Sequence, residues 1–314
     1  MAELLEILFS PAVLKVVQVL LFILIGLGFR GIRLFGDREG EVLRRFVVQF
    51  TVPVMVFFSM YDASRDAVSA LPTMAGALVL ITAALFLLGW PCSHVVKDGS
   101  QRAAVHACVT LGNYGWLGWG VCQVLLGEGG LRCAVFFTVL WWPVFYLFGL
   151  PIGVIHGRVR KGAVPIGRAV AVAAPVIGMV ILGLIFNFRG WKVPQLLSDT
   201  LRPFGNMTVP LILFSVGAML DFKTFRKALA PAVLVSAVTL VGGALIGWGV
   251  ASLLTHDPTS YKTIIVEGAM PVATLTLVLA ENYDVDVDMI NTCIVVSTVL
   301  SMVTLPILAA LVVG

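Results

Sequence analysis

Two short segments of the sequence place glycine or proline next to polar residues inside long apolar runs. The first is Leu111–Gly118 (LGNYGWLG), and the second is Glu267–Thr274 (EGAMPVAT). Glycine and proline weaken or interrupt helical hydrogen bonding, so freed backbone groups can bind a ligand together with the polar side chains. For either segment alone, close helix packing or a simple kink is the better explanation. Because both lie at equivalent positions of an internal repeat, we interpret them as two helix breaks that form one binding site.

Glu267 would supply the ionic chemistry of this site. It is the one acidic residue of 17 that lies well inside an apolar segment. An ionised carboxylate in the bilayer costs several kcal/mol unless a cation neutralises it. Glu267 is therefore expected to carry a proton or to bind Na⁺, with carbonyls near Met270 and the side chains of Thr110 and Asn113 as further ligands. The alternative is a carboxylate near the water-facing end of its helix, since Lys262 lies close by in the sequence.

The elements that carry these segments must be membrane helices. Of the 314 residues, 59% are hydrophobic and 12% are charged, and the mean hydropathy is +1.02, whereas soluble domains carry about 25% charged residues. This composition excludes a water-soluble enzyme, a secreted disulfide scaffold and a nucleic-acid-binding domain. An intramembrane enzyme lacks support, because Asp62 has no partnering GxGD aspartate. We expect an all-α polytopic membrane protein that is not an enzyme and holds no cofactor.

Apolar windows separated by charge, glycine and proline predict ten transmembrane helices. Their expected ranges are 12–30, 42–60, 68–96, 102–127, 132–156, 168–189, 201–220, 228–255, 261–281 and 290–313. Of the 21 Lys and Arg residues, 14 lie in the connections after the odd-numbered helices and 7 lie on the opposite side. Cytoplasmic connections carry the excess of positive charge. Both termini are therefore expected outside the cytoplasm, in a protein of the plasma (inner) membrane.

The sequence contains an internal repeat. Thr51–Met60 (TVPVMVFFSM) and Thr208–Gly217 (TVPLILFSVG) share Thr, Val, Pro and Phe in the same order at an offset of 157 residues. A Thr-Val-Leu triplet at 138–140 recurs at 298–300, an offset of 160 residues. Chance can produce one short match in an apolar sequence. Matches in order at a nearly constant offset indicate duplication.

The duplication divides the chain into two five-helix repeats, residues 1–156 and 157–314. Because five is an odd number, the second repeat crosses the membrane in the opposite direction, and the repeats are inverted. Asn113 and Pro271 are 158 residues apart and then occupy equivalent positions, so helices 4 and 9 are expected to be broken there. Inverted repeats with a ligand site between broken helices are typical of secondary transporters.

Short motifs along both halves carry a family resemblance. They are Thr51-Val52-Pro53, Gly112-Asn113-Tyr114-Gly115-Trp116, Val209-Pro210-Leu211-Ile212-Leu213-Phe214, Ala269-Met270-Pro271-Val272-Ala273, Glu281-Asn282-Tyr283 and Ser297-Thr298-Val299-Leu300-Ser301. In this order they resemble the auxin efflux carrier family, which contains bacterial malonate-type carriers and the plant PIN transporters. The resemblance implies two inverted five-helix repeats that jointly form a scaffold and a mobile transport unit, with helices 4 and 9 crossing. It also implies carboxylate substrates held by Asn113 and by backbone N–H groups around Pro271.

A more distant similarity concerns the proposed ion site. Glu267-Gly268-Ala269-Met270 is similar to the Glu-x-x-Met element that binds Na⁺ in the ninth helix of the bile acid:sodium symporters. This similarity implies Na⁺ at Glu267 and Met270. Na⁺ and H⁺ both remain open as the coupling ion.

We expect a secondary active transporter that moves small organic anions, in particular carboxylates, by elevator-like alternating access. The residues expected to bind substrate are Gly112, Asn113, Tyr114, Gly115, Pro271, Val272 and Thr274. The alternative is a transporter-like sensor or channel that binds a small ligand without turnover. The expected partners are the carboxylate and the lipid bilayer but no nucleic acid, and both a monomer and a homodimer are compatible with the sequence.

Overall fold

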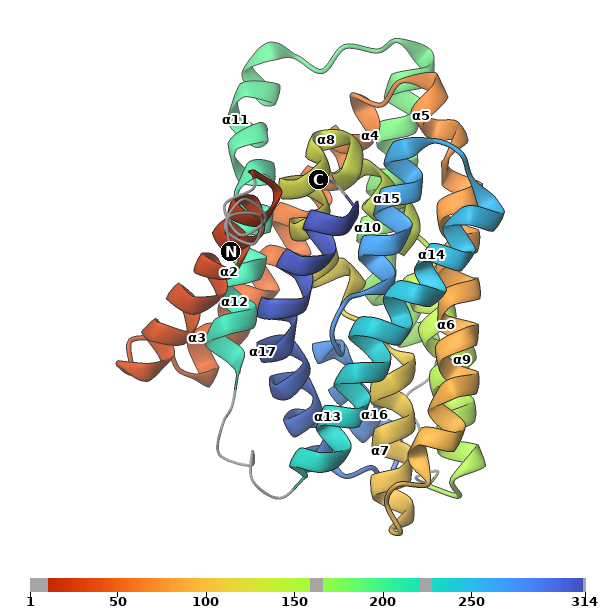
Figure 1. Cartoon of the computed structure of the whole chain (residues 1–314). Helices are drawn as coiled ribbons and strands as arrows, with labels where there is room; N and C mark the ends of the chain where they lie inside the picture. The colour runs from red at the N-terminus through yellow and green to blue at the C-terminus, as the bar shows by residue number, and fades with distance from the viewer. Residues whose placement is uncertain (1–10, 159–165, 221–227, 313–314) are drawn as a thin grey trace, which may run out of the picture.

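The structure, a computed structural model, describes residues 11–158, 166–220 and 228–312, and these are almost entirely helical (Figure 1). An isolated antiparallel β-bridge pairs Gly112 with Val272. Six described segments are long and apolar enough to cross a membrane. They are Leu14–Gly31, Arg38–Tyr61, Ala67–Ser93, Tyr114–Thr138, Leu229–Leu254 and Val287–Val312. The prediction of an all-α polytopic membrane protein is confirmed.

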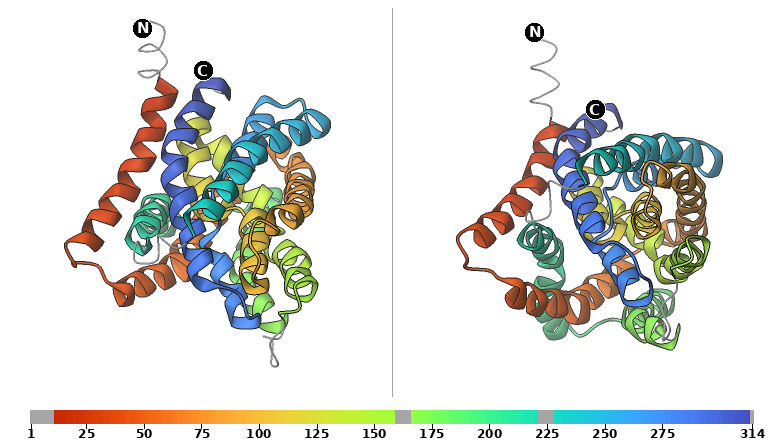
Figure 2. Two further views of the ribbon diagram at one scale, coloured as in Figure 1. Left: turned by 60° about the horizontal axis from the view of Figure 1, so that its bottom comes forward. Right: turned by 90° about the horizontal axis from the view of Figure 1, so that it is seen from below.

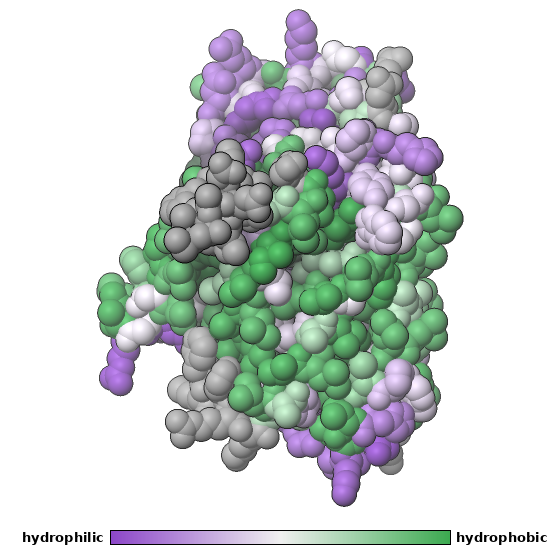
Figure 3. Space-filling view, in the orientation of Figure 1, coloured by the Kyte–Doolittle hydropathy of each residue, from purple (hydrophilic) through white to green (hydrophobic). Residues whose placement is uncertain are grey.

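The surface has the polarity that a bilayer requires. Apolar side chains cover the middle of the face seen in Figure 3, and hydrophilic side chains gather at its two ends. Many large apolar side chains of the protein are exposed, among them Leu245 on α14 (Gly243–Leu254) and Leu311 on α17 (Val287–Val312). Apolar area on this scale is not tolerated in water and marks a lipid-facing surface.

One group of helices, which we call the frame, lies on one side of the molecule (Figure 2). It consists of α2 (Pro11–Gly31), α3 (Asp37–Phe46), the π-helical turn η1 (Val47–Thr51), α4 (Val52–Tyr61), α10 (Ile166–Arg189), α11 (Gln195–Asn206) and α12 (Thr208–Met219). In the frame, α2 packs along α12, and α4 packs against α10 and α11. A Cβ at Gly26 or Gly217 would overlap the backbone of the facing helix. Small residues therefore let α2 and α12 approach closely, as is usual between membrane helices.

The other helices form a second group, which we call the crossover bundle. It consists of α6 (Leu71–Ser93), α7 (Gly99–Thr110), the π-helical turn η2 (Tyr114–Gly118), α8 (Trp119–Thr138), α9 (Trp141–Ile155), α13 (Leu229–Ala237), the π-helical turn η3 (Val238–Gly242), α14, α15 (Pro258–Gly268), the 3₁₀ helix η4 (Thr274–Val278), α16 (Leu279–Asn282) and α17. The short α5 (Arg65–Ser69) leads from the frame into α6. The bundle meets the frame mainly where α17 and α8 pack against α2.

Glycines determine how the broken helices sit in the bundle. Gly127 has φ +70° and ψ −159°, so α8 is kinked there into two parts. A Cβ at Gly243 would overlap the carbonyl of Gly268, so the end of α15 lies directly on α14. The beginning of α2 and the end of α17 lie toward the same end of the molecule (Figure 2). An even number of crossings gives this arrangement.

Candidate functional site

The two broken helices meet at their breaks. The first ends with α7 at Thr110, and the second ends with α15 at Gly268. Between them, the N–H of Asn113 donates to the carbonyl of Pro271 over 2.7 Å, and the N–H of Ala273 donates to the carbonyl of Leu111 over 2.8 Å. These bonds flank the bridge from Gly112 to Val272. Each break thus satisfies backbone groups of the other at a depth where water cannot.

Local chemistry explains why the chain can adopt this crossing. A Cβ at Gly112 would overlap the ring of Tyr114, which folds back beneath it. Pro271 has no N–H to leave unpaired. The N–H of Val272 donates to the hydroxyl of Ser297 on α17 over 3.1 Å. The second break is therefore held by backbone and by one serine.

The side chain of Asn113 is not used in holding the breaks together. Its backbone carbonyl accepts from the N–H groups of Leu117 and Gly118 at 3.1 and 3.2 Å, which begins the next helix. The side chain is 2% exposed, and neither its amide nitrogen nor its oxygen has a hydrogen-bond partner. Buried polar atoms are nearly always paired, and an unpaired one is costly. This amide therefore retains unused hydrogen-bonding capacity.

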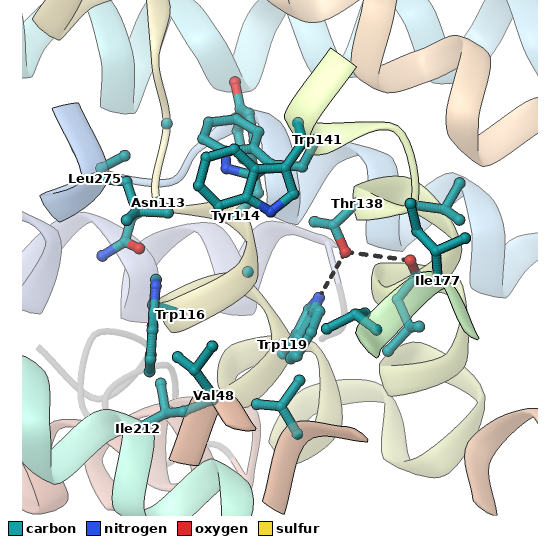
Figure 4. A pocket seen from close by; sticks show the side chains of 18 of the residues that line it. Val48, Asn113, Tyr114, Trp116, Trp119, Thr138, Trp141, Ile177, Ile212 and Leu275 are labelled. Carbon is teal, nitrogen blue, oxygen red and sulfur yellow. Dashed lines mark hydrogen bonds between the residues drawn. The ribbon is translucent and has the colours of Figure 1, made fainter. Parts of the chain in front are cut away.

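A cavity of about 290 Å³ lies beside the crossing, between the frame and the bundle. Its wall at the first break includes Gly112, Asn113, Tyr114 and Gly115, and Figure 4 shows Asn113 among the side chains that line it. The aromatic residues of its wall are Tyr114, Trp116, Trp119, Trp141, Trp142 and Tyr146. The frame contributes apolar residues, such as Val48 and Ile212, and Arg44.

The charge distribution around the cavity favours an anion with little charge. Arg44 is the one cationic side chain among the described residues that line it, and Arg44 already pairs with Glu41 at 2.7 Å. The helices that restart after the two breaks begin at Tyr114 and at Thr274. The N–H groups of a first helical turn have no acceptor within the helix and carry partial positive charge. Two such ends near one amide suit a single carboxylate.

Glu267 lies behind the crossing rather than in the cavity wall. Its side chain is fully buried, its Oε1 accepts a weak bond from the thiol of Cys122 at 3.8 Å, and its Oε2 has no partner. A Cβ at Gly118 would overlap the carboxyl. The carboxyl therefore rests against the first turn of the helix that follows Asn113. It lies on the buried side of α15, and not at a water-facing end.

The residues predicted to bind substrate are only partly brought together. Pro271 and Val272 lie in the crossing, and Thr274 begins η4, but none of the three lines the cavity. Their neighbours Ala273 and Leu275 line it instead.

Of the residues predicted to bind the ion, Thr110 donates its hydroxyl to the carbonyl of His106 at 2.8 Å. Met270 is buried, and its N–H donates to the carbonyl of Glu267 at 3.2 Å. Among the described residues no group of three or more His, Cys, Asp or Glu side chains could hold a metal ion.

Apart from Tyr114, the sequence did not reveal the aromatic wall as part of the site, nor Arg44 or Cys122. Trp141 and Trp142 are adjacent in the sequence, and such a pair in a membrane helix usually indicates packing or an interfacial position. Their place at the cavity depends on how α9 packs beside α7. Cys122 is four residues after Gly118, which places both on the side of the helix that faces α15.

Known proteins match the chain over nearly its whole length. It matches the membrane transport protein family over residues 11–153 and 168–309. It is 30% identical to an uncharacterized transporter of Methanothermobacter thermautotrophicus over 93% of this chain and 95% of that protein. It is 26% identical to a putative malonate transporter of Rhizobium meliloti over 90% of this chain and 91% of that protein.

These matches confirm the prediction of a membrane transporter rather than an enzyme. They extend over both halves of the chain and include both helix breaks. The chain belongs to the membrane transport protein family, which is the auxin efflux carrier family that its motifs resemble.

Proposed function

We propose that the protein is a secondary transporter that carries small carboxylates across the plasma membrane by alternating access. The observation that carries this proposal is the unpartnered amide of Asn113, which lies at the crossing of two broken helices and lines a cavity. The amide N–H group donates to a carboxylate oxygen, and the first turns at Tyr114 and Thr274 add partial positive charge. The bound anion accepts from the side-chain N–H of Asn113 that lacks a partner.

The cavity wall supports a carboxylate with a compact apolar body. Such a body packs against the indole rings of Trp116, Trp119 and Trp141, while its carboxylate reaches Asn113. A short dicarboxylate such as malonate would place its second charge against these rings or beside Arg44, which Glu41 already neutralises. An unpaired charge in an apolar environment is strongly disfavoured. The substrate of this chain therefore differs from the one named for the Rhizobium relative.

Both units of the fold contain matching parts of each half of the sequence, which supports two inverted five-helix repeats, residues 1–156 and 157–314. The frame combines α2–α4 with α10–α12, and the crossover bundle combines α6–α9 with α13–α17. We infer that the bundle moves against the frame as an elevator and carries the crossing with it. Both termini then lie outside the cytoplasm, as the distribution of Lys and Arg predicts.

The contacts between the two units support an inward-facing state. The cavity wall extends to Arg44, in a connection that the charge distribution assigns to the cytoplasm. Toward the opposite end, Arg132 of α8 donates to the carbonyl of Ser59 at 3.1 Å, which joins bundle to frame. Outward opening would break this contact.

Counterflow in proteoliposomes tests the proposal. Purified protein is loaded with unlabelled phenylacetate, hexanoate or malonate, and uptake of the labelled compound is measured. Saturable exchange of the two monocarboxylates at lower concentration than malonate supports the proposal. Stronger exchange of malonate contradicts the apolar substrate but keeps carboxylate transport. Binding without any exchange identifies a sensor, and passive, non-saturating flux identifies a channel.

We further propose that an ion bound at Glu267 couples transport to a gradient. The carboxyl is buried within the bundle and touches the helix that begins at the first break. Its charge state therefore affects the same element that binds substrate. Binding of either Na⁺ or H⁺ changes this charge state, so both ions fit the proposal.

A further inference from the structure

A line of polar side chains runs along α15 from its exposed end to Glu267. Ser260, Thr263 and Glu267 are spaced by three and four residues, so they share one face of the helix. Their exposed fractions are 1%, 0% and 0%. At the start of the line, the exposed Asp257 caps α15 by accepting from the N–H of Ser260 at 2.7 Å. A buried polar face on a membrane half-helix is costly unless it has a function.

Cysteines of α8 face this line. The thiol of Cys133 lies 3.8 Å from the hydroxyl of Ser260, and the thiol of Cys122 donates to Glu267 at 3.8 Å. The hydroxyl of Thr263, between them, has no partner. Together these groups place weak donors and acceptors at intervals from the surface to the buried carboxyl, and we call them the α15 polar line.

The surroundings of Glu267 do not suit Na⁺. Hard cations take several oxygen ligands, but Oε1 contacts a thiol, and Oε2 has no partner and occupies the space that a Cβ at Gly118 would fill. The hydroxyl of Thr110 donates to the carbonyl of His106 in its own helix. The set of oxygens expected for a Na⁺ site is therefore not assembled.

Among the described residues, the one cation of α8, Arg132, lies near Cys133 rather than beside the carboxyl of Glu267. The titratable groups that face Glu267 are Cys122 of α8 and Tyr114 of η2, whereas Cys133 of α8 faces Ser260. Of the other helices packed on α15, α6 and α14 contain no charged residue, and Asp288 of α17 lies at its exposed end. No salt bridge of Glu267 occurs among the described residues. An ionised carboxylate without a partner is far costlier here than a neutral one.

We infer that Glu267 is a proton-binding site, and that the proton reaches it along the α15 polar line from the non-cytoplasmic side. A proton from external water binds Oε2 of the carboxylate and gives the neutral acid. Ten residues of helix separate Asp257 from Glu267, about 15 Å, or half the hydrocarbon thickness. The α14–α15 connection lies at the same end as the start of α2 and the end of α17 (Figure 1), which the charge distribution places outside.

The carboxyl of Glu267 and the side-chain amide of Asn113 are connected through one helical turn. Gly118, against which Glu267 rests, donates its N–H to the carbonyl of Asn113 at 3.2 Å. Ionisation of Glu267 would demand water or a cation at this contact and would displace the turn that borders the substrate. This coupling rests on the transport function proposed above, whereas the presence of the proton does not.

Carbodiimide labelling tests whether the carboxyl of Glu267 is protonated, without any transport assay. Dicyclohexylcarbodiimide reacts with protonated carboxyl groups in apolar surroundings, and mass spectrometry locates the product. We expect labelling of Glu267 at neutral pH in purified protein, no labelling at this position in Glu267→Gln, and no protection by Na⁺. Labelling of wild-type protein that Na⁺ suppresses, or none at all while other carboxyls react, would overturn the inference.

Gradient-driven uptake tests the coupling and the path. In wild-type proteoliposomes, an imposed proton gradient without Na⁺ should drive accumulation, and Glu267→Gln should abolish accumulation but retain exchange. Thr263→Val keeps the side-chain shape but removes the hydroxyl between Ser260 and Glu267. It should slow accumulation about fivefold, because a passing proton then lacks one hydrogen-bonding group, worth about 1 kcal/mol. The matched control is Thr259→Val on the same helix, outside the line, which should accumulate like wild type.

The outcomes separate the two proposals. Absence of exchange by wild-type protein contradicts the proposed transport function and leaves the labelling result as the measure of the proton site. Exchange with accumulation that requires Na⁺ keeps the transport function and overturns the proton inference. Equal rates for Thr263→Val and Thr259→Val overturn the path along α15.

Discussion

The break after α7 presents a side chain to the cavity, whereas the break after α15 presents mainly backbone. Asn113 has an amide without a partner, but at the second break Pro271 has no N–H and Val272 is bonded to Ser297. The crossing needs both breaks for its backbone bonds. The difference indicates that the first break selects the ligand and that the second break holds the first in position.

The half-helices before the two breaks differ in the same way. In α7, His106 is fully buried, and both ring nitrogens have partners, His156 at 3.1 Å and the carbonyl of Phe86 at 2.9 Å. In α15, Glu267 is equally buried but has one oxygen without a partner. A satisfied buried group stabilises the fold, whereas an unsatisfied one marks a site where a ligand or proton binds. The buried group of α7 thus stabilises the fold, whereas the buried group of α15 is free to bind a ligand or a proton.

The largest expected effect is at the first break. Replacement Asn113→Ala removes hydrogen bonds to a charged group, worth about 1.5–3 kcal/mol, which is a roughly 10- to 150-fold loss of carboxylate affinity. Isothermal titration with the best exchanged carboxylate measures it. Asn206→Ala, at an exposed asparagine of the frame, is the control and should bind like wild type. Equal loss of affinity and of folded protein for Asn113→Ala would indicate a packing role instead.

The contact between the two half-helices gives the next effect. In Gly118→Ala the new Cβ overlaps the carboxyl of Glu267, and overpacking of this kind costs about 1–3 kcal/mol. Thermal unfolding in detergent should show this loss, and Glu267→Ala in the same chain should restore part of it, because it removes the overlapping atoms. Gly76→Ala has open space around the new methyl group and is the control. If Gly118→Ala and Gly76→Ala unfold at the same temperature, the carboxyl of Glu267 does not rest on Gly118.

A smaller effect is expected at the second break. Ser297→Ala leaves the N–H of Val272 without its acceptor and should lower the free energy of unfolding by about 1–3 kcal/mol. Carboxylate affinity should fall less than in Asn113→Ala, since the serine positions the break and does not touch the ligand. Ser301→Ala is the control, because that hydroxyl bonds only within its own helix. A binding loss as large as that of Asn113→Ala would remove the distinction between the breaks.

The smallest effect is expected at the histidine pair. His156→Gln retains a polar partner for His106, so uptake should depend on pH as in wild type. Glu267→Gln should remove that dependence. Uptake of both variants and of wild type, measured across a pH series, shows which substitution removes the pH dependence. A pH profile altered by His156→Gln and not by Glu267→Gln would move the proton site from α15 to α7.

The sequence predicted the breaks because their signal is local. Glycine and proline inside apolar runs are visible at Gly112 and Pro271 without knowledge of the fold, and composition alone indicates membrane helices. Ser297 could not be predicted as the partner of Val272, because its spacing with Ser301 indicates only a polar helix face. The backbone group it meets depends on where α17 passes.

The cavity wall could not be predicted for a related reason. Trp116 and Trp142 belong to different helices of the bundle, and Val48 and Ile212 belong to the two halves of the frame. Their convergence follows from long-range packing, which a single sequence does not specify. Likewise, the thiol of Cys122 is informative only because α8 lies along α15.

A structure determined with a transported carboxylate bound tests the central claim most directly. The account predicts ligand density with its carboxylate at the amide of Asn113, between the first turns that begin at Tyr114 and Thr274, and its apolar body against the tryptophan rings. Density that contacts only the frame, for example at Arg44, with the amide of Asn113 still unpartnered, would contradict it.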